Sequence, residues 1–389
     1  MAGRIKANPE PNDSRQEDDR LMEGMLDENP WGEDERVDFL TSGCVPLNLA
    51  LSGKGLDGGW ARGRVVNIVG DGSSGKTLLA LELGAVAYYL LRAGKIVSDI
   101  WPTPDNVEFV YNNAEGVMDF PVERMYGKDF YSWVNWLKSP TVEHFGHDFF
   151  NRAAKVGKKQ SLIYVIDSWD SLDSEEDLAK FDKELKATFK PKSGPGSGSD
   201  SEQKQAGSYE LGKQKYASKR FFKTTCNRML DKDITLVIIS QVRSRIGITF
   251  GEKHYRSGGD ALNFYTHQVA WLAEVAKLHK QALGKKRVYG IQARARLKRS
   301  KVSKPFRDVD FDIIFDYGVD DVGTMMNWFF GPKKDPVIWD GISYDRTELE
   351  RQVRTDRSVY EALAIDVEKV WHKIDQMTNP LSGQSKYGG

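Results

Sequence analysis

One octapeptide constrains the fold of this chain more than any other feature: Gly70-Asp71-Gly72-Ser73-Ser74-Gly75-Lys76-Thr77. It matches the phosphate-binding pattern G-x-x-x-x-G-K-[ST] at every fixed position. Residues 64–69 before it have the apolar pattern of a buried strand, and residues 78–83 after it have that of a helix. In such a unit the backbone N–H groups of the loop surround a phosphate at the positive end of the helix. The octapeptide therefore predicts a nucleoside triphosphate site.

Two residues of this motif have distinct expected roles. Lys76 would reach the β- and γ-phosphates, where it would support catalysis, and the Thr77 hydroxyl would hold Mg²⁺. The alternative is a chance Gly/Ser turn between a strand and a helix. The presence of strand, loop and helix in the required order disfavours that alternative.

The distribution of charge is more informative than its sum. Lys+Arg and Asp+Glu both number 56, so the net charge favours no particular partner. Between Lys277 and Arg307, however, there are twelve Lys/Arg and no Asp/Glu, whereas residues 1–40 carry twelve acids and five bases. Beside a triphosphate site, a basic block of this density favours a polyanionic partner such as nucleic acid. The alternative is a solvated hairpin whose charges only face water.

Cysteine content and hydropathy exclude several classes of protein. Cys44 and Cys226 are the only cysteines and lack C-x-x-C spacing, so neither a disulfide framework nor a zinc site is indicated. No apolar run approaches the ~20 residues that span a bilayer. The acidic, polar N-terminus is unlike a secretory signal. We expect a cytoplasmic protein without a membrane partner.

The pattern along the chain predicts three parts. Residues 1–37 are acidic and polar, and we expect this N-terminal extension to be disordered. Residues 38–325 alternate strands with helices, which predicts an α/β core whose mainly parallel central sheet is flanked by helices. The later strands follow one another more directly, which favours an antiparallel edge. Residues 326–389 are charged and helix-prone, and predict a small α-rich C-terminal domain with a flexible tail. The expected strands are 64–69, 107–112, 161–166, 234–240, 267–275, 287–297 and 309–315, and the expected helices are 76–93, 143–156 and 213–231.

Two stretches interrupt this alternation. Residues 191–203 are rich in Gly and Ser and predict a flexible loop. Residues 247–259 contain several glycines, show little periodicity and directly follow an expected strand. Long structureless loops inside a compact domain are usually functional. We therefore expect a functional loop over 247–259.

Two carboxylates lie where a nucleotide-binding α/β sheet needs them. Asp167 ends an apolar strand, as in the Walker B element, whose carboxylate steadies the water shell of Mg²⁺. Glu115 follows the expected strand 107–112, at the carboxyl edge where open α/β folds bind ligands. A carboxylate there can orient and activate an attacking water. The alternative for Glu115 is a surface residue that initiates a helix.

Beyond these motifs, longer segments resemble a known family. Residues 241–251 and 257–265 resemble bacterial RecA through its second DNA-binding loop. Residues 41–51, 113–115 and 299–306 are similar to further segments of that family. The resemblance covers roughly residues 38–325 and implies a RecA-type P-loop ATPase core. The second-loop segment distinguishes RecA-type recombinases from the hexameric helicases that share this core.

The resemblance implies roles for individual residues. Glu115 would be the catalytic carboxylate, and Gln241 would sense the γ-phosphate and transmit its presence to the following loop; an amide can donate to a phosphate. Asp119 would make a polar contact to adenine. Arg299 and Lys301 would reach across a subunit boundary to a neighbour's ATP. Lys223 lies in the segment that matches the first DNA loop. The residues expected to face DNA in the second loop are Arg243, Arg245, Phe250, Ser257, Gly258 and Gly259.

Several positions depart from the family pattern. Asn113 replaces the usual Asp beside Glu115, which would alter the hydrolysis rate. Val122 occupies the position of the adenine-stacking tyrosine. About a dozen extra residues precede the catalytic strand, and the first-loop region carries a longer insert. The N-terminal assembly helix and the acidic C-terminal tail are not evident. Phage-encoded relatives vary in these ways, which favours a phage source.

The resemblance implies an ATP-dependent DNA recombinase that uses ATP and Mg²⁺ and acts as a DNA-dependent ATPase. It would assemble on single-stranded DNA as a homo-oligomeric helical filament and promote homologous pairing and strand exchange with duplex DNA. Single-strand-binding and loader proteins would be further partners. Two alternatives stay open: a helicase-type motor with the same core, and a weakly hydrolysing regulatory filament protein that binds ATP and DNA. Asn113 supports the second.

Overall fold

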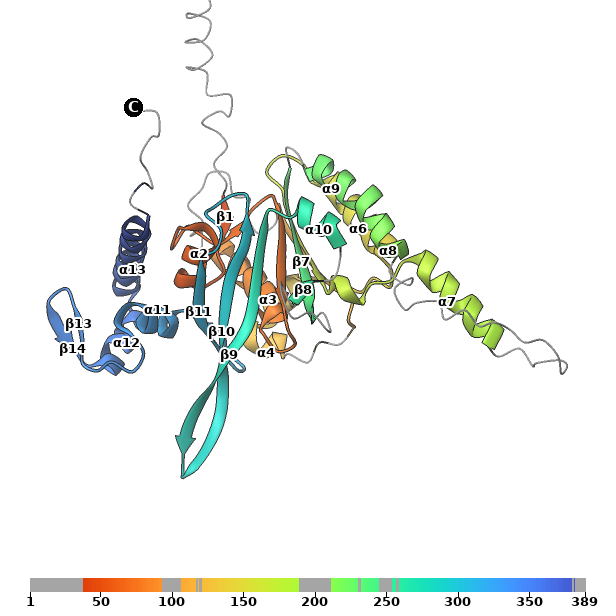
Figure 1. The fold of residues 1–389 in the computed structure, drawn as a ribbon. Coiled ribbons are helices and arrows are strands. Elements are labelled where there is room, and N and C mark those ends of the chain that lie inside the picture. Colours follow the sequence, from red (N-terminus) through yellow and green to blue (C-terminus); the bar gives the residue numbers. More distant parts are fainter. Residues whose placement is uncertain are drawn as a thin grey trace, which may run out of the picture. The chain divides into compact units, whose positions relative to one another are not determined.

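The computed structural model describes residues 38–92, 106–116, 118, 121–188, 211–229, 232–244, 254–256, 259–379 and 381. Its centre is a ten-stranded sheet (Figure 1) with the strand order β12-β11-β10-β9-β3-β7-β6-β4-β5, and β8 pairs with β7 beside this path. Two further sheets have two antiparallel strands each: β1 (Phe39–Leu40) pairs with β2 (Trp60–Ala61), which follows helix α2, and β13 (Val337–Trp339) forms a hairpin with β14 (Ile342–Tyr344). Among the described helices, none combines the length and the apolar character that a membrane crossing requires.

Parallel strands form the middle of the large sheet. Strand β3 pairs in parallel with β7 and β9, and β4 pairs in parallel with β5 and β6. Every residue of β3 and β6 is buried, because helices cover both faces and such strands need apolar side chains on both sides. The bounds are β3 Val65–Gly70, β4 Val107–Asn113, β5 Asn135–Leu137, β6 Ser161–Asp167, β7 Asp233–Ser244 and β9 Gln268–Ala282.

The later strands form the antiparallel edge that their spacing predicted. Strands β9, β10, β11 and β12 are joined in succession by antiparallel pairing. Strands β9 and β10 are much longer than their neighbours and leave the sheet as a two-stranded ribbon (Figure 1). The bounds are β8 His254–Arg256, β10 Lys285–Ser300, β11 Asp308–Ile314 and β12 Gly318–Asp320.

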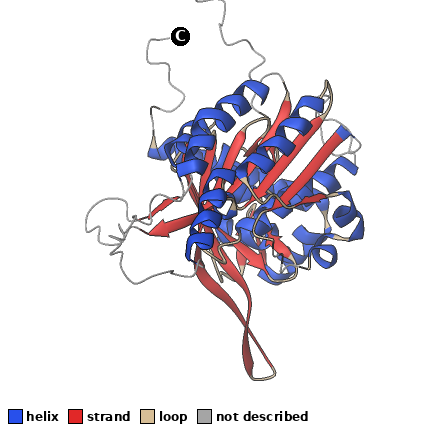
Figure 2. Cartoon of the chain, turned by 90° about the vertical axis from the view of Figure 1, so that its right-hand side faces the viewer, coloured by secondary structure: helices blue, strands red, loops and turns tan. Residues whose placement is uncertain are grey.

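Helices cover both faces of the sheet (Figure 2) and enclose two apolar cores. One core lies against α2, α3, α4, α5 and the C-terminal helices α11–α13, and the other lies against α6, α9 and α10. The helical bounds are α2 Val45–Ser52, α3 Lys76–Arg92, α4 Val122–Tyr126, α5 Lys128–Trp133, α6 Val142–Lys155, α7 Glu175–Thr188, α8 Leu211–Tyr216, the π-helical turn η4 Ala217–Phe221, α9 Phe222–Met229, α10 Gly259–Tyr265, α11 Asp321–Phe330, α12 Arg346–Thr355 and α13 Arg357–Thr378.

The seven predicted strands and the three predicted helices are confirmed, with the helix expected at 213–231 divided into α8, η4 and α9. The expectation of a structureless stretch at 247–259 is wrong at 254–256. There, β8 pairs antiparallel with β7 and satisfies backbone groups that a loop would leave to solvent. Helix α11 runs from Asp321 to Phe330, across the expected domain boundary, and packs on α2 and β11. The acidic segment 1–37 and the Gly/Ser-rich stretch lie outside the described residues.

Candidate nucleotide and nucleic-acid site

The loop between β3 and α3 leaves no room for a side chain at two of its fixed positions, and at one of them the backbone is also left-handed. Gly75 has φ +88°, and a Cβ built there would lie 2.4 Å from Cδ1 of Ile313. A Cβ on Gly70 would lie 2.5 Å from the Ser74 Oγ and 2.7 Å from the Leu272 carbonyl oxygen. Real Cβ atoms do not approach so closely. A side chain at Gly70 would push against backbone, and one at Gly75 would be strained by the positive φ and would displace the Ile313 side chain. The close turn at the start of α3 is the arrangement in which backbone N–H groups can surround an anion.

Lys76 and Thr77 face the carboxyl ends of the central strands. The Lys76 Nζ donates to the Asp71 carbonyl oxygen at 2.6 Å, across the loop itself. The Thr77 hydroxyl donates to Oδ2 of Asp167 at 2.7 Å, which joins the first turn of α3 to the end of β6. Burial lowers the pKa of Lys76, partly offset by Asp167 and Glu115. The two residues that the sequence placed around Mg²⁺, Thr77 and Asp167, are therefore in direct contact.

Tyr111 of β4 is a member of this site that the sequence analysis missed. Its hydroxyl donates to the same Asp167 oxygen at 2.5 Å. Burial raises the pKa of Tyr111 well above its usual value, and the charge of Asp167 raises it further, so the phenol stays a donor. Burial likewise raises the pKa of Asp167, although Tyr111 and Thr77 lower it. Tyr111 was missed because a tyrosine inside an apolar strand has the pattern of a core residue.

Glu115 and Gln241 meet at the same edge of the sheet. The Gln241 Nε2 donates to Oε1 of Glu115 at 3.1 Å, and the Ser168 hydroxyl donates to that oxygen at 2.8 Å. Gln241 lies beside Gly70 in the pairing of β7 with β3, and Asn113 lies beside Asp167 in the pairing of β4 with β6. Glu115 and Gln241 are both exposed, so a ligand can reach them. Ser168, which follows the cis peptide bond after Asp167, was not predicted as a site residue.

Strand β7 continues past Gln241 toward the segment expected to bind DNA. The Gln241 backbone N–H donates to Oδ2 of Asp170 at 2.8 Å, and the Arg243 guanidinium lies 3.9 Å from the same carboxylate. Asp170 was not predicted as a site residue; it lies in the short 3₁₀ turn Trp169–Ser171 that follows β6. This carboxylate therefore anchors β7 immediately after the glutamine side chain.

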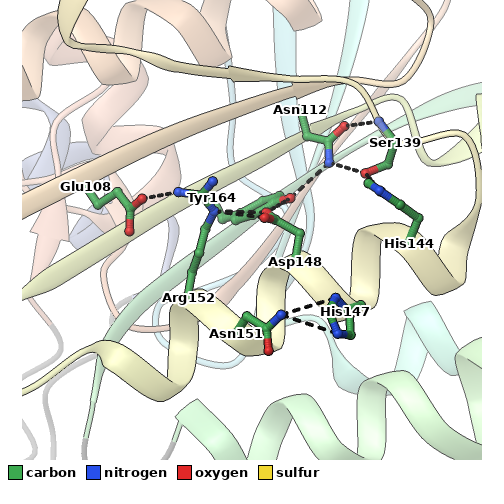
Figure 3. A network of polar contacts seen from close by, with 9 residues as sticks. All are labelled: Glu108, Asn112, Ser139, His144, His147, Asp148, Asn151, Arg152 and Tyr164. Carbon is green, nitrogen blue, oxygen red and sulfur yellow. Dashed lines mark hydrogen bonds and ion pairs between the residues drawn. The ribbon is translucent and has the colours of Figure 1, made fainter.

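Figure 3 shows a polar network that supports the end of β4. Asn112, which precedes Asn113, donates to Ser139 Oγ at 2.8 Å and to Tyr164 OH at 2.9 Å, and its Oδ1 accepts from the Ser139 N–H at 2.9 Å. Tyr164 donates to Asp148 of α6 at 2.9 Å, and Arg152 donates to the same carboxylate at 2.9 Å. The network fixes strand β4 against β6 and α6, and so fixes the base of the loop that carries Glu115.

A second buried network links β3 to the strand that ends the DNA-loop segment. Asn67 lies three residues before Gly70 and is fully buried; its Nδ2 donates to the Ile238 carbonyl at 2.7 Å and to the Ser240 hydroxyl at 2.9 Å. The Arg256 guanidinium of β8 donates to Oδ1 of Asn67 and to the side-chain carbonyl of Asn263. Burial and, to a smaller extent, the charge of Arg299 together lower the pKa of Arg256 to about 10. All polar atoms of the Asn67 side chain are thereby paired.

Arg299 and Lys301 lie away from the P-loop of their own chain. Arg299 pairs with Val269, and Val269 pairs with Asn67, three residues before the P-loop begins. At about 3.3 Å per residue this is roughly 10 Å short of the loop along the strand direction, and two strands across. The Arg299 guanidinium donates to the Asn263 carbonyl, and the Lys301 Nζ donates to the Phe264 carbonyl at 2.9 Å. The structure therefore does not bring them to the nucleotide residues of the same chain.

The other predicted residues are placed as follows. Lys223 is exposed on α9, Arg243 is exposed on β7, and Gly259 is the first residue of α10. Val122 is buried at the start of α4, so its side chain is not free to stack on a base. The predicted residues outside the described part of the chain are Asp119, Arg245, Phe250, Ser257 and Gly258.

A pocket of about 510 Å³ lies beside the Glu115 loop. It is lined by Asn113, Gly116, Met118, Val122, Tyr131, Trp136, Leu137 and Lys138. The Tyr131 and Trp136 rings have their centroids 5.2 Å apart, so the wall is largely aromatic and aliphatic. Its chemistry suits a flat, weakly polar group.

The residues present fit a magnesium–triphosphate ligand. Residues 70–77 would surround the phosphates with backbone N–H groups, since glycine occupies the positions where a side chain would close the loop. Lys76 supplies a cation, while Thr77 and Asp167 supply the hydroxyl and carboxylate oxygens that Mg²⁺ prefers. Together these groups can bind a triphosphate and hold a carboxylate, Glu115, where a water could be activated.

Comparisons with known proteins agree with this arrangement. Residues 202–320 match the model of the RecA N-terminal domain. Protein RecA of Gloeothece citriformis (strain PCC 7424) is 25% identical over 292 residues, which cover 75% of this chain and 68% of that protein. Protein RecA of Prochlorococcus marinus (strain MIT 9211) is 23% identical over 347 residues, 84% of this chain and 80% of that protein. The crystal structure of the RadB recombinase matches 73% of this chain and 99% of its own, with 16% identity and a TM-score of 0.45. The RecA domain match and the RecA relatives show that this chain is similar to proteins of the RecA family.

Proposed function

We propose that this chain is an ATP-dependent DNA recombinase that forms helical filaments on single-stranded DNA and promotes homologous pairing and strand exchange. The observation that carries the proposal is the Gln241 side chain. Its amide donates to Glu115, while its strand continues directly toward the segment expected to bind DNA. One side chain thus belongs to the nucleotide site and to the strand that leads out of it.

Nucleotide binding would be coupled to the DNA-binding segment by a change of hydrogen-bond partner of the Gln241 amide. Its Nε2 now serves Glu115, which also accepts from Ser168. A γ-phosphate carries more negative charge than a carboxylate and has three acceptor oxygens, so it competes with Glu115 for that amide. Transfer of the amide from Glu115 to the phosphate would shift the end of β7 and free Glu115 to activate water. The loop beyond β7 would then have a different order with triphosphate than with diphosphate.

The DNA-facing residues of the proposal are exposed cations near this strand. Arg243 lies two residues after Gln241, and Lys223 lies on α9; both are exposed. Contacts of this type go to phosphates, so the affinity would fall steeply with salt and depend little on sequence. Arg245, Phe250, Ser257, Gly258 and Gly259 complete the proposed interface.

Filament assembly is the part of the proposal that Arg299 and Lys301 support. Arg299 lies roughly 10 Å short of its own P-loop along the strand direction, and Lys301 lies further away still, so they are poorly placed to serve it. In a filament they would contact the triphosphate bound by a neighbouring copy. ATP would then sit at a subunit boundary, and its binding would strengthen assembly.

Asn113 favours a second candidate, a regulatory ATP- and DNA-binding filament protein with little turnover. Its Oδ1 accepts from the Gly116 N–H at 3.0 Å, so the neutral amide holds the Glu115 turn without adding a charge beside it. Measuring ATP hydrolysis with and without single-stranded DNA separates the candidates. The recombinase proposal expects DNA to stimulate turnover strongly. Slow hydrolysis that DNA leaves unchanged would favour the regulatory candidate.

A further inference from the structure

The outer parts of β9 and β10, residues 277–289, form a ribbon that has no role in the site described above. Beyond Gly290, which still pairs with Ile314 of β11, the two strands pair only with each other, apart from one hydrogen bond that the Phe315 N–H donates to the Tyr289 carbonyl at 3.0 Å. Every residue from Val288 back to Lys285 is exposed, as are those that face them on β9. Five residues beyond Gly290 correspond to about 17 Å of strand. An isolated two-stranded ribbon in water has little intrinsic stability, so its length requires a reason.

The ribbon is uniformly basic. No Asp or Glu occurs between Glu274 and Asp308. In the described part of the chain, none of the ribbon's outer cations forms an ion pair. By contrast, Arg294 and Arg296, which lie where β10 is part of the sheet, form ion pairs with Asp310 and Asp308. The outer cations are Lys277, Lys280, Lys285, Lys286 and Arg287.

The turn at the tip of the ribbon has a left-handed backbone at a leucine, which disfavours that conformation. Leu283 has φ +49° and Gly284 has φ +73°, the left-handed pair of a type I′ turn. Asn or Asp is preferred at the first of these positions, because a branched apolar side chain is strained there. The Leu283 side chain is also completely exposed, at 101% of its reference area. The chain therefore carries an apolar side chain where both backbone and solvation disfavour it, and residues held in that way are often functional.

We propose that the β9–β10 ribbon is an arm that binds duplex DNA, with its lysines and arginine on the phosphates and Leu283 wedged against the base pairs at the tip. The proposal rests on the proposed function, and names the surface that receives the duplex. A two-stranded β-ribbon fits a major groove about 12 Å wide and 8.5 Å deep, and an arm of about 17 Å reaches its floor. Apolar side chains such as leucine are known wedges between base steps in proteins that bend DNA from the minor groove, and Leu283 would act in the same way from the tip of the ribbon.

Protection of the ribbon edges against pairing with other chains explains less. Charged side chains are a common means of protecting strand edges, and acidic side chains would serve this purpose as well as basic ones. It does not explain why acids are absent throughout this stretch. Nor does it explain an exposed leucine in a strained turn, which makes an edge more adhesive. Both features are expected of a surface that receives a polyanion with stacked apolar bases.

The first test removes the three cations nearest the turn. K285Q/K286Q/R287Q is compared with the matched control K158Q/K333Q/K334Q, which removes three charges from exposed lysines elsewhere. Binding of the full chain to a duplex and to a single strand is measured by fluorescence anisotropy at several salt concentrations, with and without an ATP analogue. Each lost duplex phosphate contact reduces the salt slope by about 0.9, so the ribbon variant should have a duplex slope shallower by about 2.7. When salt rises from about 50 to 200 mM, the wild type should therefore lose roughly 40-fold more duplex affinity than the ribbon variant loses.

The second test replaces Leu283 by Asn. L283N suits the left-handed turn, so its stability should equal or exceed that of the wild type, and a loss of function cannot come from unfolding. We expect wild type to increase the fluorescence of 2-aminopurine placed in a duplex, because a wedge unstacks the base, and L283N to lose this increase.

The proposal is overturned if the ribbon variant binds duplex like its control, or if it loses affinity for single strands and duplexes equally. It is also overturned if L283N unstacks the base as the wild type does. These outcomes are separate from failure of the proposed function. That failure would appear as single-strand binding by the wild type that does not respond to the ATP analogue.

Discussion

Glu82 of α3 provides a quantitative test of how the nucleotide-binding helix is held. Its carboxylate accepts from the Tyr126 hydroxyl of α4 at 2.8 Å, and a Cβ on Gly318 would lie 2.7 Å from the same oxygen. Burial raises the pKa of Glu82 from 4.5 to about 7, and the hydrogen bonds only partly offset this effect. The site therefore favours a neutral carboxylic acid between α3, α4 and β12.

The sign of the effect follows from proton linkage. Below about pH 4.5 Glu82 is protonated in both the folded and the unfolded chain, and its stabilising contribution is fully present. Between about pH 4.5 and pH 7 the unfolded chain has lost the proton and the folded chain has not, so stability falls as pH rises. The whole shift corresponds to about 3 kcal/mol. Because Glu82 keeps some contact with solvent, we expect about 2 kcal/mol between roughly pH 5 and pH 8.

The perturbation is Glu82→Gln, which keeps an oxygen to accept from Tyr126 and cannot ionise. The assay is urea unfolding followed by tryptophan fluorescence at several pH values. The variant should gain stability over wild type by about 2 kcal/mol as the pH rises from roughly 5 to 8. Glu123→Gln on α4 is the matched control, because it makes the same change at an exposed position and should leave the wild-type profile unchanged. Parallel profiles for Glu82→Gln and wild type would refute the reasoning.

The remaining predictions concern the site and its networks. Lys76→Ala should abolish triphosphate binding in calorimetry, and full retained affinity would contradict the P-loop assignment. Glu115→Gln should bind ATP and DNA but hydrolyse ATP about 10²–10⁴-fold more slowly, and near-normal turnover would exclude a catalytic role. Arg299→Ala should impair cooperative ATP hydrolysis more than nucleotide binding by the monomer; a change in DNA affinity alone would argue against the contact across subunits. Arg256→Met leaves the Asn67 oxygen unpaired and should cost about 1–3 kcal/mol of stability in urea unfolding, and Asn67→Leu in the same chain should recover part of this loss.

The central fold was predictable because its local signals agree with its tertiary structure. Apolar runs such as 161–166 could only be buried strands once helices were expected between them, and the direct succession of later strands indicated the antiparallel edge. Helix α7 was not predicted, since Leu178, Phe181 and Leu185 are exposed among charges and belong to neither core. Strand β8 was not predicted, because a strand of three residues is too short to show a periodicity of its own.

The site residues that belong to a sequence motif could be predicted, whereas those that reach the site only through the tertiary structure could not. Asp167 and Gln241 lie toward the carboxyl ends of their strands, Thr77 and Glu115 come after theirs, and parallel strands bring these ends to one edge. Tyr111 and Ser168 complete the same cluster only through the register of β4 beside β6, which no local pattern encodes. Buried networks such as that of Asn67 are similarly invisible, because a lone polar residue in a strand does not indicate its partner.

The coupling through Gln241 is tested most directly by the affinity of the wild-type protein for single-stranded DNA in three nucleotide states. Anisotropy titrations with a non-hydrolysable ATP analogue, with ADP and without nucleotide should give tight binding only in the first state. Typical allosteric couplings change affinity by about 5- to 150-fold, so a difference in this range is expected. Equal affinity in all three states would mean that the triphosphate does not control the DNA-binding segment, and would contradict the proposed function.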